Sequence, residues 1–193
     1  MERPVGQAVI RHCWRCAAIL PAVPPTTCPV CGEVHYVNPK PCGNAVVIDG
    51  DRVLLLLRAR DPDAGAWMMP GGFCEAGEHP RAACERELLE ETGLPGRAVA
   101  YLGAWMDVYG PPAPDGLQIQ TVVSGYLCRL ADPAATPQPD PSEAQEVRWF
   151  GLGALPEPLA FPAHVPAMIR AGAELVAGRG TGANGLPRML DAS

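Results

Sequence analysis

Long hydrophobic runs are absent from this 193-residue chain. Its longest uninterrupted aliphatic stretch is Val53–Leu57, whereas a membrane-spanning helix needs about 20 apolar residues. The first nine residues, MERPVGQAV, also lack the basic and apolar segments of a secretory signal peptide. We therefore expect a cytoplasmic protein that does not cross a membrane, and its eight cysteines would mostly stay reduced there.

Positive charge is also scarce. The chain has 15 Lys and Arg residues against 21 Asp and Glu residues, which gives a net charge of −6. This balance argues against long-range attraction to nucleic acid or to an anionic membrane surface. An acidic enzyme that handles phosphates needs a local source of positive charge, and a bound divalent metal ion is the usual one.

Proline and glycine are abundant, with 23 and 21 residues, and they cluster. The clusters at 110–116 and 131–141 predict surface loops, and residues 178–193 predict a flexible tail. Between the clusters lie segments with strand or helix patterns. The predicted strands are 44–48, 52–60, 98–105, 117–130 and 146–152, and the predicted helices are 80–92 and 163–177. Strands interleaved with helices in this way predict an α/β domain with a mixed sheet.

The helix predicted at 80–92 is unusually acidic on one side. Glu87, Glu90 and Glu91 fall on one stripe of the helix, where like charges repel each other. Carboxylates three and four residues apart can reach a common point, and hard oxygen ligands suit Mg²⁺ or Mn²⁺. The alternative is a solvated acidic surface without a ligand.

The spacing around this helix favours the metal site. From Gly72 the chain reads Gly, five residues, Glu78, seven residues, Arg86-Glu87-Leu88, one residue, Glu90-Glu91-Thr92-Gly93-Leu94. This pattern resembles the complete Nudix box, and the resemblance extends over roughly residues 40–176. It implies an α/β/α sandwich that hydrolyses a nucleoside diphosphate linked to another group.

The resemblance also implies roles for the residues of the box. The catalytic, metal-binding carboxylates would be Glu87, Glu90 and Glu91, and the metal ions that they hold would bridge the diphosphate and lower the pKa of a bound water. Glu78 and Arg86 would form a structural ion pair, and the carbonyl group of Gly71 or Gly72 would be a further metal ligand.

The group that accepts the proton of the attacking water is less well defined by the sequence. In Nudix proteins it is either a glutamate of the box or one from a later loop. Glu146 lies three residues before Trp149, where similar proteins carry a metal-binding glutamate, and Glu143 is close by. We prefer Glu146 as a catalytic metal ligand, and both residues could instead be ordinary acids ahead of a strand.

Four cysteines near the start of the chain form a second candidate metal site. CWRC and CPVC are separated by eleven residues, a spacing typical of tetrahedral Zn²⁺ bound by Cys13, Cys16, Cys28 and Cys31. Two disulfides are disfavoured in a cytoplasmic chain, and redox chemistry is disfavoured without a βαβ setting. We predict a zinc ribbon at residues 8–38, a Nudix domain at 39–177 and a flexible tail at 178–193.

A zinc ribbon can also bind nucleic acid, but this one is a poor candidate. Residues 1–41 contain four basic and two acidic residues and no basic aromatic stripe. The arrangement resembles the zinc-ribbon Nudix hydrolases, in which the ribbon is structural or helps the dimer, and this implies a homodimer. We therefore expect a small-molecule nucleotide as the substrate.

The identity of that nucleotide is suggested by short segments. The array typical of NADH pyrophosphatases is absent after the box, whereas LPEPLAFPAHVPAM (155–168) resembles a segment of zinc-ribbon enzymes that cleave ADP-ribose or FAD. Trp105 or Tyr109 is expected to stack on an adenine or flavin ring, or else to pack under the sheet. The alternatives are NADH, an oxidised nucleotide, or a non-catalytic nucleotide-sensing or RNA-binding module.

Overall fold

The computed structural model describes residues 10–22, 24–111 and 118–178. The tail predicted at 178–193 therefore lies outside the described residues, apart from Gly178. The described residues form two compact units. The N-terminal unit lies within Met1–Lys40 and Val108–Gln120, and the main unit lies within Pro41–Asp107 and Thr121–Ser193.

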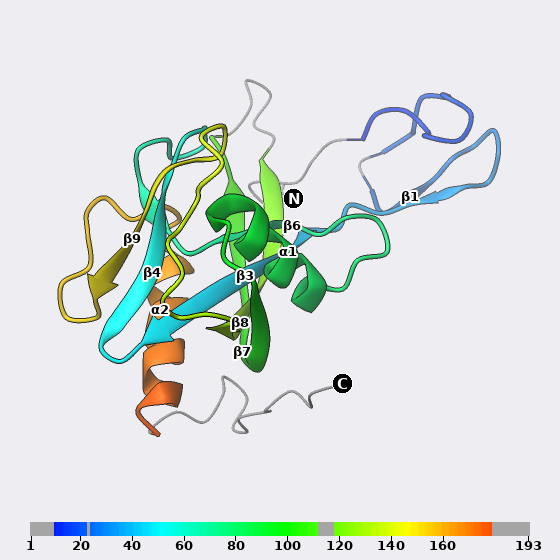
Figure 1. Cartoon of the computed structure of the whole chain (residues 1–193). Helices are drawn as coiled ribbons and strands as arrows, with labels where there is room; N and C mark the ends of the chain where they lie inside the picture. The colour runs from blue at the N-terminus through cyan, green and yellow to red at the C-terminus, as the bar shows by residue number, and fades with distance from the viewer. Residues whose placement is uncertain (1–9, 23, 112–117, 179–193) are drawn as a thin grey trace. The chain divides into compact units, whose positions relative to one another are not determined.

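The main unit is built on a seven-stranded mixed sheet (Figure 1). Its strands are β3 (Lys40–Asp49), β4 (Arg52–Arg58), β5 (Trp67–Met68), β6 (Gly71–Phe73), β7 (Gly96–Tyr109), β8 (Ile119–Leu130) and β9 (Ala144–Gly151). The order along the sheet is β5-β4-β3-β8-β7, with β6 paired to β3 and β9 paired to β4. The observed strand β7 is longer than the strand predicted at 98–105, since it continues to Tyr109.

The hairpin between β3 and β4 follows from its turn residues. Asp49 pairs with Arg52, and Ile48 pairs with Val53. Gly50 has φ 61°, a left-handed conformation that a tight hairpin turn requires and that glycine adopts without strain. The hairpin expected from the Asp-Gly-Asp turn is therefore confirmed.

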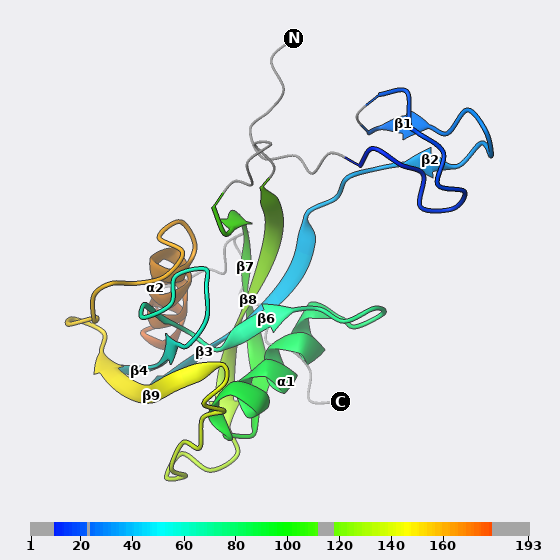
Figure 2. The same ribbon diagram turned by 90° about the horizontal axis from the view of Figure 1, so that it is seen from above.

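Two helices, α1 (Pro80–Thr92) and α2 (Val165–Val176), cover opposite faces of the sheet (Figure 2). On β3, Ala45 and Val47 belong to the same buried cluster as Leu88 of α1. The alternate residues point the other way, since a Cβ at Gly172 of α2 would lie 2.8 Å from Val46 and 3.2 Å from Ile48. This three-layer packing is the predicted α/β/α sandwich.

The ends of α1 are set by local sequence. The His79 side chain accepts a hydrogen bond from the Arg81 N–H, and Pro80 occupies the first turn, where its missing N–H has no cost. Gly93 ends the helix in the left-handed conformation with φ 71°. Among the described residues, neither α1 nor α2 is long and apolar enough to cross a bilayer.

The N-terminal unit is a small cysteine-centred fold. Its two strands, β1 (Thr26–Thr27) and β2 (Val34–His35), pair antiparallel. The buried residues at its centre are Cys13, Leu20 and Cys28. So few apolar residues make a weak core, and units of this size usually need a metal or disulfides for stability.

Candidate functional site

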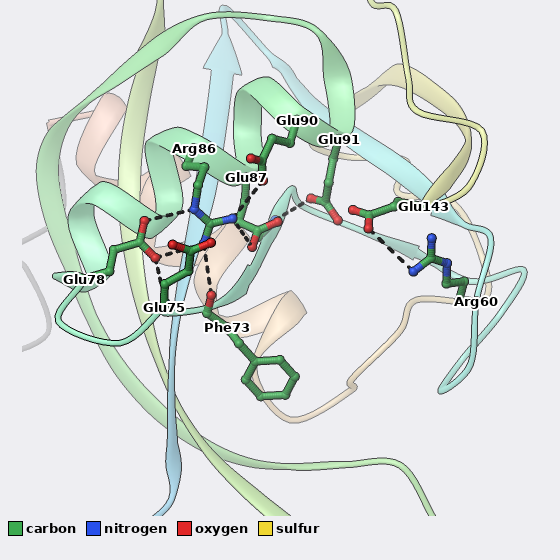
Figure 3. A network of polar contacts seen from close by, with 10 residues as sticks. Arg60, Phe73, Glu75, Glu78, Arg86, Glu87, Glu90, Glu91 and Glu143 are labelled. Atoms are coloured by element: carbon green, nitrogen blue, oxygen red, sulfur yellow. Dashed lines mark hydrogen bonds and ion pairs between the residues drawn. The ribbon is translucent and has the colours of Figure 1, made fainter.

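Three carboxylates from two distant parts of the sequence meet beside α1. One carboxylate oxygen from each of Glu87, Glu91 and Glu143 lies within 4.8 Å of the other two. Glu87 and Glu91 are four residues apart on α1 and project from the same face. Figure 3 shows Glu143 directed toward Glu91 from the loop before β9. This carboxylate cluster offers three hard oxygen ligands, a donor set that suits Mg²⁺ or Mn²⁺.

Glu91 is the buried member of the cluster, with 7% of its surface exposed. Its carboxylate accepts a hydrogen bond of 2.8 Å from the Gly71 N–H. Burial raises the pKa of Glu91 to about 8, the Gly71 N–H opposes this shift, and the charges of Glu87 and Glu143 add to it. A cation beside these carboxylates would reverse the shift, because it favours their charged forms.

The Gly-Gly turn of β6 leaves room for the cluster. A Cβ at Gly72 would lie 2.6 Å from the carboxyl carbon of Glu87. A Cβ at Gly71 would lie 2.5 Å from Cγ of Asn44, the residue that Gly71 pairs with on β3. Glycine at both positions therefore lets β6 approach α1 and β3 closely. The predicted ligand residues Gly71 and Gly72 lie beside the carboxylate cluster.

Arg86 donates most of the side-chain hydrogen bonds drawn around the carboxylate cluster (Figure 3). It donates two hydrogen bonds of 2.9 Å to the two carboxylate oxygens of Glu78 and one of 3.1 Å to the Phe73 carbonyl. Arg86 lowers the pKa of Glu78 to about 2, and the Glu75 N–H acts in the same direction. The pair therefore fixes the loop before α1 to the middle of the helix.

The remaining N–H groups of Arg86 contact two of the three glutamates of the acidic stripe. Its Nη1 lies 2.8 Å from a carboxylate oxygen of Glu87 and 2.8 Å from one of Glu90. The Glu90 side chain is 54% exposed and lies outside the carboxylate cluster. Of the three glutamates of the helix that were predicted as metal ligands, two are therefore brought together with Glu143, while Glu90 lies outside the cluster and is paired with Arg86.

Glu146 lies on β9, whereas Glu143 lies in the loop just before it. Val147 packs against the core cluster on the α1 side, and neighbouring residues of a strand point to opposite faces, so Glu146 points away from α1. Its carboxylate instead pairs with Arg148 at 3.1 Å. The structure thus brings Glu143, and not the preferred Glu146, to the carboxylate cluster, and a role for Glu146 in catalysis stays a prediction.

The loop that carries Glu143 is fixed by backbone hydrogen bonds. The Gln138 N–H donates to the carbonyl of Thr92, the last residue of α1, at 2.8 Å. The Ala59 N–H, just after β4, donates to the carbonyl of Glu143 at 2.9 Å. The register of β4 with β9 also shifts between Leu57 and Arg58. Bulges of this kind change the direction of side chains next to active sites.

The four cysteines of the N-terminal unit form the second candidate metal site. The Sγ atoms of Cys13, Cys16, Cys28 and Cys31 lie within 4.8 Å of one another. The separations are 3.6 Å for Cys13–Cys31 and for Cys16–Cys28, close to the roughly 3.8 Å edge of a tetrahedron with Zn–S bonds of about 2.3 Å. The Cys31 N–H lowers the pKa of Cys28 to about 7. This donor set fits Zn²⁺.

The two residues predicted to stack on the substrate lie near the end of β7. Trp105 and Tyr109 are both half-buried. Trp105 belongs to the main unit and Tyr109 to the N-terminal unit. Their contact with a substrate ring stays a prediction.

One buried contact was missed by the sequence analysis. His164 Nδ1 lies 2.6 Å from a carboxylate oxygen of Asp107, and both side chains are buried. Burial lowers the pKa of His164, and Asp107 opposes this shift. The ring of Phe161 stacks on that of His164 at 5.3 Å. Phe161 and His164 belong to the segment that resembled ADP-ribose and FAD enzymes, whereas nothing in the sequence indicated Asp107, 57 residues away.

The same segment borders the strand that leads to the Gly-Gly turn. The Trp67 N–H donates to the Pro158 carbonyl, and the Ala160 N–H donates to the Trp67 carbonyl, both at 2.9 Å. The segment therefore pairs in parallel with β5 at Leu159, beside the strand that precedes the Gly-Gly turn.

The architecture and the site define a class: an α/β/α sandwich whose capped acidic helix faces a Gly-Gly turn. The NUDIX domain family matches residues 40–170. The chain therefore belongs to the Nudix hydrolase family.

Two relatives and one solved structure illustrate the relationship. The chain is 32% identical over 138 residues to the NAD-capped RNA hydrolase NudC of Stutzerimonas stutzeri, covering 70% of this chain and 44% of the relative. It is 32% identical over 133 residues to the ADP-ribose pyrophosphatase of Methanocaldococcus jannaschii, covering 65% of this chain and 69% of the relative. A NUDIX hydrolase from Nitrosomonas europaea superposes with a TM-score of 0.69 at 27% identity, covering 89% of this chain and 95% of that one. The chain thus spans less than half the length of the NudC relative.

Proposed function

We propose that the protein is a divalent-cation-dependent hydrolase that splits the pyrophosphate bond of a nucleoside diphosphate derivative, with ADP-ribose or FAD as the foremost substrate and AMP as a product. The observation that carries this proposal is the carboxylate cluster of Glu87, Glu91 and Glu143 beside a Gly-Gly turn. Carboxylates that meet at one point hold a cation at that point. The cation can then stabilise charge only on phosphates bound next to it. Bonds distant from the diphosphate would gain nothing from that charge.

The donor set of the cluster fits Mg²⁺ or Mn²⁺, because it consists of carboxylates and lies beside the backbone of Gly71 and Gly72. The divalent cation, when bound, neutralises charge on the phosphates and lowers the pKa of a water. We propose Glu87 and Glu91 as its ligands, with Glu90 joining them from its position on Arg86. The Glu78–Arg86 pair holds the loop and the helix in register.

We propose Glu143 as the group that accepts the proton of the attacking water. Its carboxylate lies with Glu87 and Glu91, is 39% exposed and sits on a loop, so water can reach it. Glu146 is the alternative, and it would have to leave Arg148 to take this role. Replacing each of the two residues by Gln separates these assignments.

The choice of ADP-ribose or FAD rests on the segment around Phe161 and on the relative named ADP-ribose pyrophosphatase. The relative named NAD-capped RNA hydrolase supports a second candidate, the NAD-type cap of an RNA. Both candidates contain an adenosine diphosphate, and the same bond would be cleaved. Either Trp105 or Tyr109 is proposed to stack on the ring of the bound nucleotide.

We further propose that the four-cysteine cluster binds a structural Zn²⁺, as the sulfur separations of 3.6 Å support. A zinc ribbon at 8–38 would then precede the Nudix domain at 39–177. We also propose that the protein is a cytoplasmic homodimer.

A turnover screen tests the proposed function. ADP-ribose, FAD, NADH and a short NAD-capped RNA are each incubated with Mg²⁺ or Mn²⁺ in ¹⁸O-labelled water, and the products are identified by mass spectrometry. We expect the label on a product phosphate, with AMP released from ADP-ribose and FAD. Label on free ribose, or turnover without a divalent cation, would contradict the proposal.

A further inference from the structure

Arg60 lies at the edge of the carboxylate cluster, and its role rests on the proposed function. We propose that Arg60 is an exchangeable counter-ion of Glu143. In the unloaded enzyme it pairs with this carboxylate. Once a divalent cation occupies the carboxylate cluster, it displaces Arg60 from Glu143, and Arg60 turns to a phosphate of the substrate.

The contact between Arg60 and Glu143 has the properties of an exchangeable pair. Nη1 of Arg60 lies 3.6 Å from a carboxylate oxygen of Glu143, and the two side chains are 61% and 39% exposed. Ion pairs this long and this exposed contribute little to stability because water competes for both groups. A divalent cation held by neighbouring carboxylates can therefore displace the guanidinium easily.

The other arginines close to the site are held by protein groups. Arg86 is bound bidentately by Glu78 and also by Glu87 and Glu90. Arg58 donates to the carbonyl of Pro62 at 2.7 Å and contacts the sulfur of Met68 at 3.0 Å. Its guanidinium also lies 5.1 Å from the centre of the Phe161 ring. These contacts would have to break before either arginine could reach a substrate. Within the described part of the chain, Arg60 has one long ion pair to give up, with Glu143, besides a longer-range attraction to Asp140.

The position of Glu143 does not depend on the Arg60 side chain. The Glu143 carbonyl is fixed by the Ala59 N–H at 2.9 Å, and its N–H is fixed by the Asp140 carbonyl at 3.0 Å. The Gln145 side chain donates to the Arg58 carbonyl at 3.2 Å. Loss of the Arg60 guanidinium therefore leaves Glu143 in place and removes a competitor for its carboxylate.

The freed guanidinium would be well placed for an anion. A cation bound at the carboxylate cluster would also bind the diphosphate of the substrate, so phosphate oxygens would lie next to Glu143. A planar guanidinium matches the geometry of phosphate oxygens with two parallel hydrogen bonds, and an ammonium group does not. Arg60 would then contribute to substrate binding and not to metal binding.

This reasoning predicts effects of opposite sign on two binding constants. In the variant Arg60→Gln, the affinity for Mn²⁺ without nucleotide should stay equal or rise, since the cation no longer competes with the guanidinium. The affinity for the non-hydrolysable α,β-methylene analogue of ADP-ribose, measured with Mn²⁺, should fall about tenfold, the size of one lost charge-assisted contact. Mn²⁺ binding is measured by electron paramagnetic resonance and analogue binding by calorimetry.

Two variants provide the controls. Arg60→Lys keeps the charge without the planar fork and should restore only part of the analogue affinity. Arg52→Gln removes another exposed arginine, whose side chain is 51% exposed against 61% for Arg60, from an ion pair with Asp49 at 2.6 Å, and it should change neither constant.

The possible outcomes separate the explanations. Weaker Mn²⁺ binding by Arg60→Gln would mean that Arg60 only holds Glu143 in place, and it would overturn the proposal. Unchanged analogue binding would also overturn it. The proposed function itself fails, and the inference with it, if the unmodified protein does not bind Mn²⁺. The same holds if the Glu91→Gln variant binds Mn²⁺ as tightly as the unmodified protein.

Discussion

Gly72 offers a direct test of how closely the turn of β6 controls the carboxylate cluster. In Gly72→Ala, the new Cβ would lie 2.6 Å from the carboxyl carbon of Glu87, whereas ordinary van der Waals contact begins at 3.4 Å. One carboxylate oxygen of Glu87 would lie closer still, so the carboxyl group must move by at least the difference, about 0.8 Å. Metal–ligand distances tolerate only about 0.2 Å, and a misplacement of about 1 Å in an active site can cost roughly 10²-fold in rate.

The expected result is a fall of about 10²-fold in kcat/KM on ADP-ribose together with weaker Mn²⁺ binding. The free energy of unfolding should fall by less than about 1.5 kcal/mol, because the atoms in the way belong to the end of a side chain that can rotate. Steady-state kinetics, Mn²⁺ titration and urea unfolding measure the three quantities.

The matched control is Gly153→Ala, where the new Cβ would meet no atom within 4 Å and φ is not in the left-handed region. It should leave activity and Mn²⁺ binding unchanged. Normal kcat/KM in Gly72→Ala would refute the argument that this glycine makes room for Glu87. An equal loss of activity and of folded protein would instead mean that the substitution damages the fold.

Three further predictions concern the two candidate metal sites. Glu91→Gln keeps the volume of a buried ligand but removes its charge, so kcat should fall about 10²-fold or more, and near-normal turnover at saturating Mg²⁺ would disprove the metal-site assignment. Glu78→Gln should lower the free energy of unfolding by about 1–2 kcal/mol at pH 7. Because Arg86 lowers the pKa of Glu78 from 4.5 to about 2, the difference from the unmodified protein in urea unfolding should be full above pH 4.5 and vanish as the pH falls toward 2; a difference independent of pH would argue against the ion pair. Cys28→Ser should abolish the one Zn²⁺ per chain expected from elemental analysis and unfold the N-terminal unit, and a metal-free protein with disulfides between these cysteines would contradict the zinc site.

Local sequence was sufficient for the elements whose ends are set by nearby residues. The helix α1 was predicted at 80–92 and observed at Pro80–Thr92, because a proline opens it and a left-handed glycine closes it. The hairpin of β3 and β4 followed from its turn in the same way. The alternation of Ala45 and Val47 with Val46 and Ile48 on β3, buried on both faces, also matched a sheet between two helix layers.

Contacts between distant parts of the chain were not predictable from these local signals. The sequence favoured Glu146 over Glu143, but the choice between them depends on where β9 begins and on which face of the strand Glu146 occupies. That choice follows from the register of β9 against β4, including the shift between Leu57 and Arg58. The pairing of His164 with Asp107 depends in the same way on where β7 ends relative to α2.

The hydrogen bond from the Gln138 N–H to the last carbonyl of α1 has a consequence for protein engineering. It fixes the start of the segment that ends at Glu143, and the Ala59 N–H fixes the other end. The number of residues from 138 to 143 is therefore set by geometry, and a single insertion there should move the Glu143 carboxylate out of reach of Glu87 and Glu91. The preceding residues 132–137 are mostly exposed, so an epitope or a fluorescent label is better inserted there, where a change in length leaves both anchoring hydrogen bonds intact.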